Sequence, residues 1–159
     1  MLPIDPAPTS GWSLRVATAS DVEEIAELRA LVLRGDLERL GRYDEVRVRQ
    51  RFRDGFRVEH TWAIEMSGVL VGSVALRSED EWVWLEHFYV APQRQRSGLG
   101  SAVLTALLHR CDQDDAVVRL MVLQGSPARR FYERHGFEVE AEDPIDVFMV
   151  RPVRRPVVT

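Results

Sequence analysis

The spacing of hydrophobic residues changes from helical to strand-like and back again along the chain. A short strand is predicted at residues 12–17, and the capping box formed by Ser20 and Glu23 opens a helix after it. Helical spacing gives this helix one apolar face, made of Val22, Ile25, Leu28 and Val32. A charged helical region follows at about 36–56, interrupted near Gly41. The first third of the chain is therefore predicted to form a strand followed by two helices.

The central segment alternates between apolar and polar positions with a period of two. A strand at 61–66 is followed by Ser67-Gly68, a turn signal, and by a partner strand at 69–76. Residues 81–91 form a third strand that is rich in aromatic and β-branched side chains. These three segments predict an antiparallel meander.

The last third of the chain alternates between helices and strands. The predicted elements are a polar loop, a helix, a strand, a second helix and two final strands, at 92–100, 99–111, 117–123, 126–136, 137–140 and 146–150. Ser126 and Pro127 are a strong helix start, because serine is a good N-cap and proline is favoured in the first turn. The complete order, β-α-α-β-β-β-α-β-α-β-β, predicts an α/β (α+β) sandwich around a mixed sheet.

The composition is that of one ordinary folded domain. The chain has 159 residues, of which 45% are hydrophobic and 29% are charged. We expect a single domain at 12–152, a proline-rich lead-in at 1–11 and a tail at 153–159. A single cysteine, Cys111, excludes an internal disulfide and a multi-cysteine zinc site.

The charge and the apolar runs limit the partners that we expect. The net charge is −4, from 21 basic and 25 acidic residues, which predicts no general attraction to nucleic acid or to anionic lipid. No apolar run approaches the roughly 20 residues of a membrane span. The first ten residues lack the pattern of a signal peptide, so we expect a cytoplasmic protein.

Residues 95–100, with the sequence QRSGLG, lie between a predicted strand and a predicted helix and have the character of an anion site. Backbone N–H groups at a helix start point outward, and the helix dipole adds positive potential. Gly98 and Gly100 let the backbone approach a phosphate, and Arg94 and Arg96 add charge. The segment is neither a Walker motif nor a dinucleotide fingerprint, and taken alone it also fits a plain strand–helix turn.

Two blocks of sequence together resemble the GNAT superfamily of N-acetyltransferases. Residues 85–100, LEHFYVAPQRQRSGLG, are similar to the acetyl-CoA motif of that family. Residues 126–137, SPARRFYERHGF, are similar to its Asn-Pro-Ala-x-x-Phe-Tyr-Glu-x-x-Gly-Phe block. The element order also matches the family fold, so the resemblance covers about 12–152. It implies a mixed, mostly antiparallel sheet flanked by helices and splayed between the fourth and fifth strands.

The resemblance implies where acetyl-CoA would bind. The family has a β-bulge in the strand that ends at Val90, and the pantetheine arm pairs with backbone groups beside it. The implied contacts are Phe88, Tyr89, Val90, Gln95, Arg96, Ser97, Gly98, Leu99, Gly100, Ser101 and Ser126. Two positions depart from the family pattern. Ser126 replaces a common asparagine, and Arg96-Ser97 replaces a Gly-Arg or Gly-Lys pair, so the positive charge moves by one position.

Glu86 is the candidate catalytic base. Strand alternation predicts that it shares a face with the aromatic and aliphatic side chains of Trp82, Trp84, Phe88 and Val90, with His87 on the opposite face. Desolvation by such neighbours strengthens a carboxylate as a base. The alternatives are a glutamate paired with an arginine of the second helical region, a water relay from a more distant carboxylate, or no dedicated base.

Tyr132 is the candidate catalytic acid, because it matches the family tyrosine on the helix after the fifth strand. A phenol has a pKa near 10, close to that of an alkyl thiol, so protonation of the leaving thiolate is roughly balanced. The alternative is a tyrosine that only packs in the core. Cys111 has no histidine at a recognisable spacing, so we expect direct transfer in a ternary complex, without a metal.

The leading hypothesis is an acetyl-CoA-dependent N-acetyltransferase that acts on a primary amine of a small molecule or a protein. Its acceptor pocket is expected between residues 36–56, Trp62, Trp82 and Trp84. Family members are often homodimers, which makes a homodimer an expectation here. A second hypothesis is an acyl-CoA sensor of the same fold without turnover. A nucleic-acid binder is disfavoured, because Arg47, Arg49, Arg51 and Arg53 would scatter around a helix.

Overall fold

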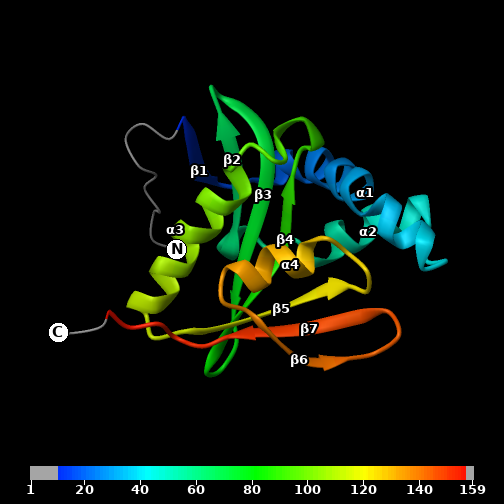
Figure 1. Cartoon of the computed structure of the whole chain (residues 1–159). Coiled ribbons are helices and arrows are strands. Elements are labelled where there is room, and N and C mark those ends of the chain that lie inside the picture. Colours follow the sequence, from blue (N-terminus) through cyan, green and yellow to red (C-terminus); the bar gives the residue numbers. More distant parts are fainter. Residues whose placement is uncertain (1–10, 157–159) are drawn as a thin grey trace.

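Seven strands form one sheet in the computed structural model, which describes residues 11–156 (Figure 1). The strands are β1 (Trp12–Val16), β2 (Thr61–Met66), β3 (Val69–Ser78), β4 (Trp82–Val90), β5 (Val117–Leu123), β6 (Glu138–Glu142) and β7 (Asp146–Arg151). Their spatial order is β1-β2-β3-β4-β5-β7-β6, and every neighbouring pair is antiparallel except the parallel pair β4–β5. The sequence therefore predicted the fold class and the order of the elements correctly.

The helices cover the two faces of this sheet (Figure 1). They are α1 (Val22–Arg39), α2 (Glu45–Gly55), α3 (Leu99–Gln113) and α4 (Ala128–Arg134), joined by short 3₁₀ turns at Ala19–Asp21, Val58–His60 and Pro92–Arg94. Helices α3 and α4 lie on one face, and α1 and α2 lie on the other (Figure 1). No helix within residues 11–156 is both long enough and apolar enough to cross a membrane.

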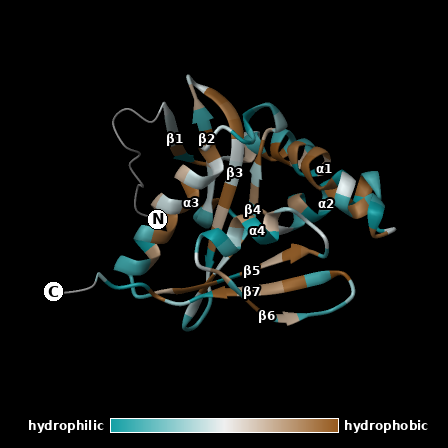
Figure 2. Ribbon diagram, in the orientation of Figure 1, coloured by the Kyte–Doolittle hydropathy of each residue, from teal (hydrophilic) through white to brown (hydrophobic). Residues whose placement is uncertain are grey.

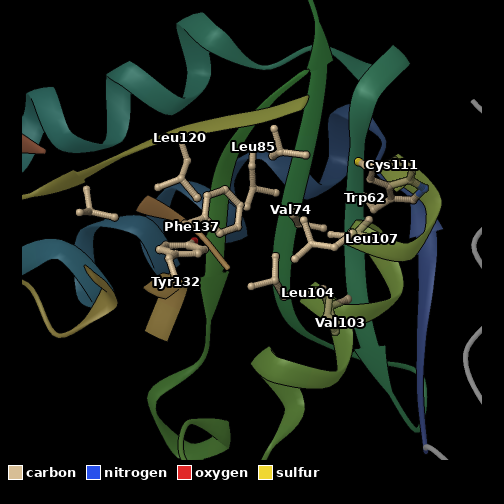
Figure 3. Packing of buried hydrophobic residues seen from close by; sticks show 14 of the residues in the cluster. Trp62, Val74, Leu85, Val103, Leu104, Leu107, Cys111, Leu120, Tyr132 and Phe137 are labelled. Carbon is tan, nitrogen blue, oxygen red and sulfur yellow. The ribbon is translucent and has the colours of Figure 1, made fainter. Parts of the chain in front are cut away.

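Two clusters of buried side chains hold these layers together. The larger cluster packs α3 and α4 against the sheet and includes Leu104, Leu107, Leu120, Tyr132 and Phe137 (Figure 3). The smaller cluster lies under α1 and α2 and is formed by Ile25, Ala26, Phe52 and Tyr89, with Val22, Leu28 and Val32 packed against it. The predicted apolar face of the first helix is confirmed by these contacts, because three of its four residues pack at the edge of this cluster and Ile25 at its centre.

The first helical segment begins two residues earlier than the sequence indicated. Thr18 and Asp21 form the capping box, and the Asp21 carboxylate accepts a hydrogen bond of 2.8 Å from the Thr18 backbone N–H. The predicted box of Ser20 and Glu23 is wrong, because Ser20 lies inside a 3₁₀ turn and the Glu23 carboxylate pairs with Arg53. Asp21 also pairs with Arg15 at 2.8 Å, which fixes the junction of β1 and α1.

Strand β4 contains a β-bulge at its centre. Ala75 of β3 is paired with Glu86, whereas Ser73, two residues earlier, is paired with Tyr89, so β4 has one residue more than β3 in this interval. The extra residue is His87, whose φ of 48° lies in the left-handed region. Because of the bulge, every later side chain of β4 lies on the face opposite to the one that strict alternation predicts.

The parallel pairing of β4 with β5 ends early. Paired residues run only from Trp82 with Val117 to Trp84 with Arg119, and the later halves of both strands have no mutual pairing. Strand β5 continues to pair with β7 along its whole length. The splay implied by the resemblance is therefore confirmed, and the edge of β4 from Leu85 onward is available to a ligand.

The C-terminal segment is attached to α3. Arg151 and Asp112 form a buried ion pair of 2.8 Å, and the Arg154 backbone N–H donates to the same carboxylate at 2.9 Å. The predicted tail at 153–159 is thus docked at its beginning, and residues 157–159 lie outside the described part of the chain. Of the predicted lead-in at 1–11, only Gly11 is described.

Candidate active site

The loop before α3 presents backbone N–H groups to solvent. Arg96 and Gly98 both adopt left-handed conformations, with φ of 60° and 86°. The first helical hydrogen bond to the Gly98 carbonyl comes from the Ala102 N–H, so the N–H groups of residues 99–101 precede the hydrogen-bonded ladder. Gly98 is the N-cap and supplies no side-chain acceptor. This arrangement is a concave set of donors suited to an anion.

The charges of this loop are uncompensated. Within residues 11–156, Arg94 and Arg96 have no acidic partner, although most other arginines of the protein do. The Ser97 hydroxyl donates to the Arg94 carbonyl and so stabilises the turn itself. The Ser101 hydroxyl lies 3.0 Å from Nε2 of His135, which leaves its backbone N–H as the group that can face a phosphate.

The loop is connected directly to the splayed edge of β4. Ala91 N–H donates to Val71 of β3, so by strand alternation the backbone groups of Val90 point to the opposite edge, toward the splay. The Val90 carbonyl there accepts a hydrogen bond of 3.0 Å from the Gln95 side chain. A Cβ added to Gly100 would lie 3.9 Å from the Val90 side chain, so the start of α3 lies against the end of β4. A ligand bound at the loop can therefore continue along this edge.

Tyr132 lies in the core beside the splay. It is 8% exposed, and its ring centroid lies 5.2 Å from that of Phe131 and 5.4 Å from that of Phe137 (Figure 3). Phe131 in turn contacts Phe88 of β4, with ring centroids 6.4 Å apart. Burial raises the pKa of Tyr132 above the ordinary value of a phenol, and Tyr89 adds to the shift. The phenol is therefore protonated throughout the physiological pH range, and it is a weaker acid than the free phenol for which the sequence predicted a balanced proton transfer.

The predicted binding residue at the start of α4 has a structural partner. The Ser126 hydroxyl accepts a hydrogen bond of 3.1 Å from the Ala128 N–H, so it caps the helix as predicted. The regular helix begins at Ala128, one residue after Pro127, which itself has helical dihedral angles. Any contact of Ser126 with a ligand must be made in addition to this cap.

Glu86 forms a salt bridge with a strand neighbour. Its carboxylate lies 2.7 Å from Nη2 of Arg77 and 3.2 Å from Nε of the same side chain. The partner is an arginine, as one of the alternatives stated, but it comes from β3 and not from the second helical region. The Glu86 side chain is 29% exposed, so it has access to solvent as well as to its partner. Arg77 was missed by the sequence analysis, because its proximity depends on the register of two strands.

The bulge corrects the predicted distribution of side chains in β4. Phe88 and Val90 pack with Leu85 against the α3–α4 cluster, and they do not share a face with Glu86 as predicted. His87 lies on the α1–α2 side, where it contacts Phe52 with ring centroids 5.1 Å apart. Strand alternation places Glu86 on this side too, because Leu85 faces the other core. The prediction that His87 and Glu86 lie on opposite faces is therefore wrong.

The sheet separates two residues of the expected acceptor pocket, Trp62 and Trp84, whereas Trp62 and Trp82 both line a cavity near the C-terminal end of α3. Trp82 and Trp84 lie on the face opposite to Leu85, together with Arg119, whose guanidinium lies 4.8 Å from the Trp82 ring centroid. Trp62 is buried on the other face, beside Cys111 of α3 (Figure 3). Trp62 therefore cannot line one pocket with Trp84.

Two further features have no role at this site. A cavity of about 770 Å³ lies between the β3–β4 connection and the C-terminal end of α3, which is about 22 Å from the loop at the other end of that helix. Cys111 lies at the edge of this cavity, and burial raises the pKa of its thiol to about 11. The thiol is thus neutral and unsuited to act as a nucleophile.

The comparison with family profiles gives one decisive match. The profile described as "Acetyltransferase (GNAT) domain" matches residues 38–147, which is more than half of the chain. The chain belongs to the GNAT acetyltransferase family. The comparison with curated proteins finds no match.

Solved structures of GNAT proteins share the fold at low sequence identity. A PaiA N-acetyltransferase from Thermoplasma acidophilum, in complex with coenzyme A, has a TM-score of 0.70 at 20% identity, over 89% of this chain and 98% of that chain. The ribosomal-protein-S18-alanine N-acetyltransferase from Escherichia coli has a TM-score of 0.68 at 16% identity, over 92% and 96%. Ard1 from Thermoplasma volcanium has a TM-score of 0.67 at 22% identity, over 91% and 99%. At these identities the likeness establishes the fold.

The arginines of α2 are partly neutralised. Arg49 pairs with Glu27 at 2.7 Å, and Arg53 pairs with Glu23 at 2.8 Å, both across the α1–α2 interface. These ion pairs connect the two helices of this GNAT domain. They leave no continuous basic surface of four arginines for a nucleic-acid backbone.

Proposed function

We propose that the protein is an acetyl-CoA-dependent N-acetyltransferase that transfers the acetyl group directly to a primary amine. One observation carries this proposal: the donor-rich loop at 95–101 and the unpaired edge of β4 meet at Val90. A diphosphate on the loop and an extended arm along the strand edge would then lie in one continuous site. The family membership and the fold shared with a coenzyme A complex support the same conclusion.

The donor side of the site lies between β4 and α4. The N–H groups of residues 99–101, with Arg94 and Arg96, would hold the diphosphate of coenzyme A. Backbone groups of Phe88 and Val90 would pair with the pantetheine arm in the manner of an added strand. This binding would aim the thioester toward Tyr132, whose phenol holds a proton that the leaving thiolate can accept.

The acceptor side lies on the face of β4 that carries Glu86. The deprotonated amine nitrogen would attack the carbonyl carbon of the thioester, a C–N bond would form, and the C–S bond would break as the thiolate leaves with the proton of Tyr132. The nitrogen would then lose its second proton, which restores the proton of Tyr132 directly or through water. Glu86 would take the proton of the ammonium, directly or through a water molecule, while Arg77 holds its carboxylate in position. Donor and acceptor would thus approach the splay from opposite faces of the sheet, so both can be bound at the same time, as direct transfer in a ternary complex requires.

A thiol-release assay tests the proposal. Purified protein is mixed with acetyl-CoA and a panel of primary amines, and free thiol is followed over time. We expect amine-dependent release of coenzyme A together with an equal amount of N-acetylated product. Binding of coenzyme A without thiol release for any amine would favour the alternative of an acyl-CoA sensor and would contradict the proposed activity.

A further inference from the structure

One face of β5 and β7 carries apolar side chains that belong to neither core. In β5, Val118, Leu120 and Val122 point into the α3–α4 cluster, so Arg119, Met121 and Leu123 point to the other side. Met121 is 53% exposed, which is unusual for an apolar residue in an inner strand. Strand β5 is covered on one face only.

The neighbouring strand extends this apolar surface. Met121 is paired directly with Phe148 of β7, and Arg119 with Val150, so Phe148 and Val150 share the uncovered side. Neither Phe148 nor Val150 packs against the two buried clusters, whereas Met149 between them is fully buried. We call the residues Met121, Leu123, Phe148 and Val150 the apolar strip. Figure 2 shows β5 and β7 coloured toward the hydrophobic end of the scale.

The apolar strip is continuous with the acceptor side of the candidate site. Trp84 is paired with Arg119 in the last register pair before the splay, so it lies on the same face as Met121. Glu86 follows two residues later on that face, at the edge of the splay. When the nitrogen of an amine lies at Glu86, the rest of the molecule would therefore lie over Trp84 and the apolar strip.

Arg119 and Glu86, the charged groups nearest Trp84, are paired with protein groups. Arg119 pairs with Glu140 at 2.8 Å and stacks on Trp82, and Glu86 pairs with Arg77. At the far end of β7, burial and the neighbouring Asp143 raise the pKa of Asp146, and Arg51 from α2 offsets part of this rise. Between these charged groups the surface offers an apolar contact area.

From these observations we propose that the acceptor is a primary monoamine on an aromatic or apolar group, which binds over Trp84, Met121 and Phe148 with its nitrogen at Glu86. This inference rests on the proposed acetyl transfer and names its substrate class. The burial of one aromatic group favours such an amine over a small one by about tenfold or more in kcat/KM. A polyamine or a dicarboxylic amino acid would place further charged groups on the apolar side chains of the strip, at a cost in desolvation.

The test compares kcat/KM for 2-phenylethylamine, ethylamine, spermidine and glutamate, with product detected by mass. The expected order places 2-phenylethylamine first, about tenfold or more above ethylamine. Met121→Ser and Phe148→Ala should bring the ratio of these two amines toward one while turnover of ethylamine persists. Val69→Ser, a matched change at another exposed apolar residue, on the β2–β3 hairpin, should leave the ratio unchanged.

The possible outcomes separate the two claims. Turnover with no preference for the aromatic amine, or with spermidine or glutamate first, would overturn the inference and leave the acetyltransferase proposal intact. A preference that Met121→Ser and Phe148→Ala do not alter would also overturn it. Light scattering tests whether a second copy of the chain covers the apolar strip instead. If these variants turn a dimer into a monomer while the ratio of kcat/KM for the two amines stays unchanged, the strip is a subunit interface and the inference is wrong. Absence of turnover with every amine would remove both claims.

Discussion

Nδ1 of His87 lies 3.0 Å from the hydroxyl oxygen of Tyr89, at the centre of the bulge in β4. The same hydroxyl accepts a hydrogen bond of 2.9 Å from Nε of Arg29, so its own proton is free to be donated to His87. Nδ1 is then the acceptor, and the neutral ring carries its proton on Nε2. Arg29 also donates to the Val48 carbonyl of α2. The chain of bonds therefore connects α1, α2 and the bulge.

Protonation of His87 should weaken the fold. Burial lowers the pKa of His87 to about 4 from an ordinary value of 6.5. Between these values the unfolded chain binds more protons than the folded chain, so stability falls as the pH falls from 6.5 toward 4. The loss is at most about 3 kcal/mol, at 1.36 kcal/mol per unit.

Urea unfolding at pH 7, 5.5 and 4.5 measures this effect. His87→Gln should show a smaller loss of stability over this range than the parent protein, because the titrating ring is gone. His109→Gln, at an exposed position of α3, is the control and should retain the parent slope. Equal slopes in the parent and His87→Gln would show that the His87 ring does not titrate in this window.

Gly72→Ala should destabilise the bulge. A Cβ at this position would lie 2.4 Å from the Tyr89 carbonyl oxygen, and the backbone at both positions is held in the sheet. The overlap should cost about 1–3 kcal/mol in the free energy of unfolding. Gly35→Ala is the matched control, because its Cβ meets nothing within 4 Å in the middle of α1, and alanine there should stabilise by about 0.5–1 kcal/mol. A neutral Gly72→Ala variant would contradict the register of β3 and β4 described above.

Tyr132→Phe should lower kcat by about a hundredfold or more while the affinity for coenzyme A stays the same. The ring contacts with Phe131 and Phe137 are retained in this variant, so packing changes little. Because burial raises the pKa of Tyr132, titration of this residue should cause no decrease of kcat below pH 10. Unchanged turnover in Tyr132→Phe would remove it as the acid.

Glu86→Gln should lower kcat/KM near neutral pH by about a hundredfold. Without a base the reaction depends on the fraction of amine already deprotonated, so the rate of this variant should rise tenfold per pH unit up to the pKa of the amine. Glu79→Gln removes the other carboxylate that pairs with Arg77 and serves as the control, with nearly parental rates expected. Equal effects of the two substitutions would show that only the ion pairing of Arg77 matters.

Local sequence signals predicted most elements of this fold. Helical spacing, turn residues and the Ser126 cap are properties of neighbouring residues, and each was found where it was expected. The glycine N-cap of α3 was equally predictable, because only the absence of a capping side chain had to be noticed. The misplaced capping box is an error of two residues within the same type of signal.

The errors at the candidate site have a non-local cause. Strict alternation through β4 fails at His87, because one extra residue moves Phe88 and Val90 to the other face. The resemblance implied a bulge in this strand without its position, and the adjacent polar residues Glu86 and His87 in an otherwise apolar strand were the local signal for it. The pairing of Glu86 with Arg77 follows from the β3–β4 register, which no local pattern contains.

Binding of coenzyme A, measured by titration calorimetry, tests the central claim most directly. We expect saturable binding of one coenzyme A per chain, weakened about tenfold by Arg96→Glu and unchanged by Arg110→Glu at the opposite end of α3. Absence of binding heat, or equal affinities for the parent protein and Arg96→Glu, would contradict a diphosphate site at the start of α3.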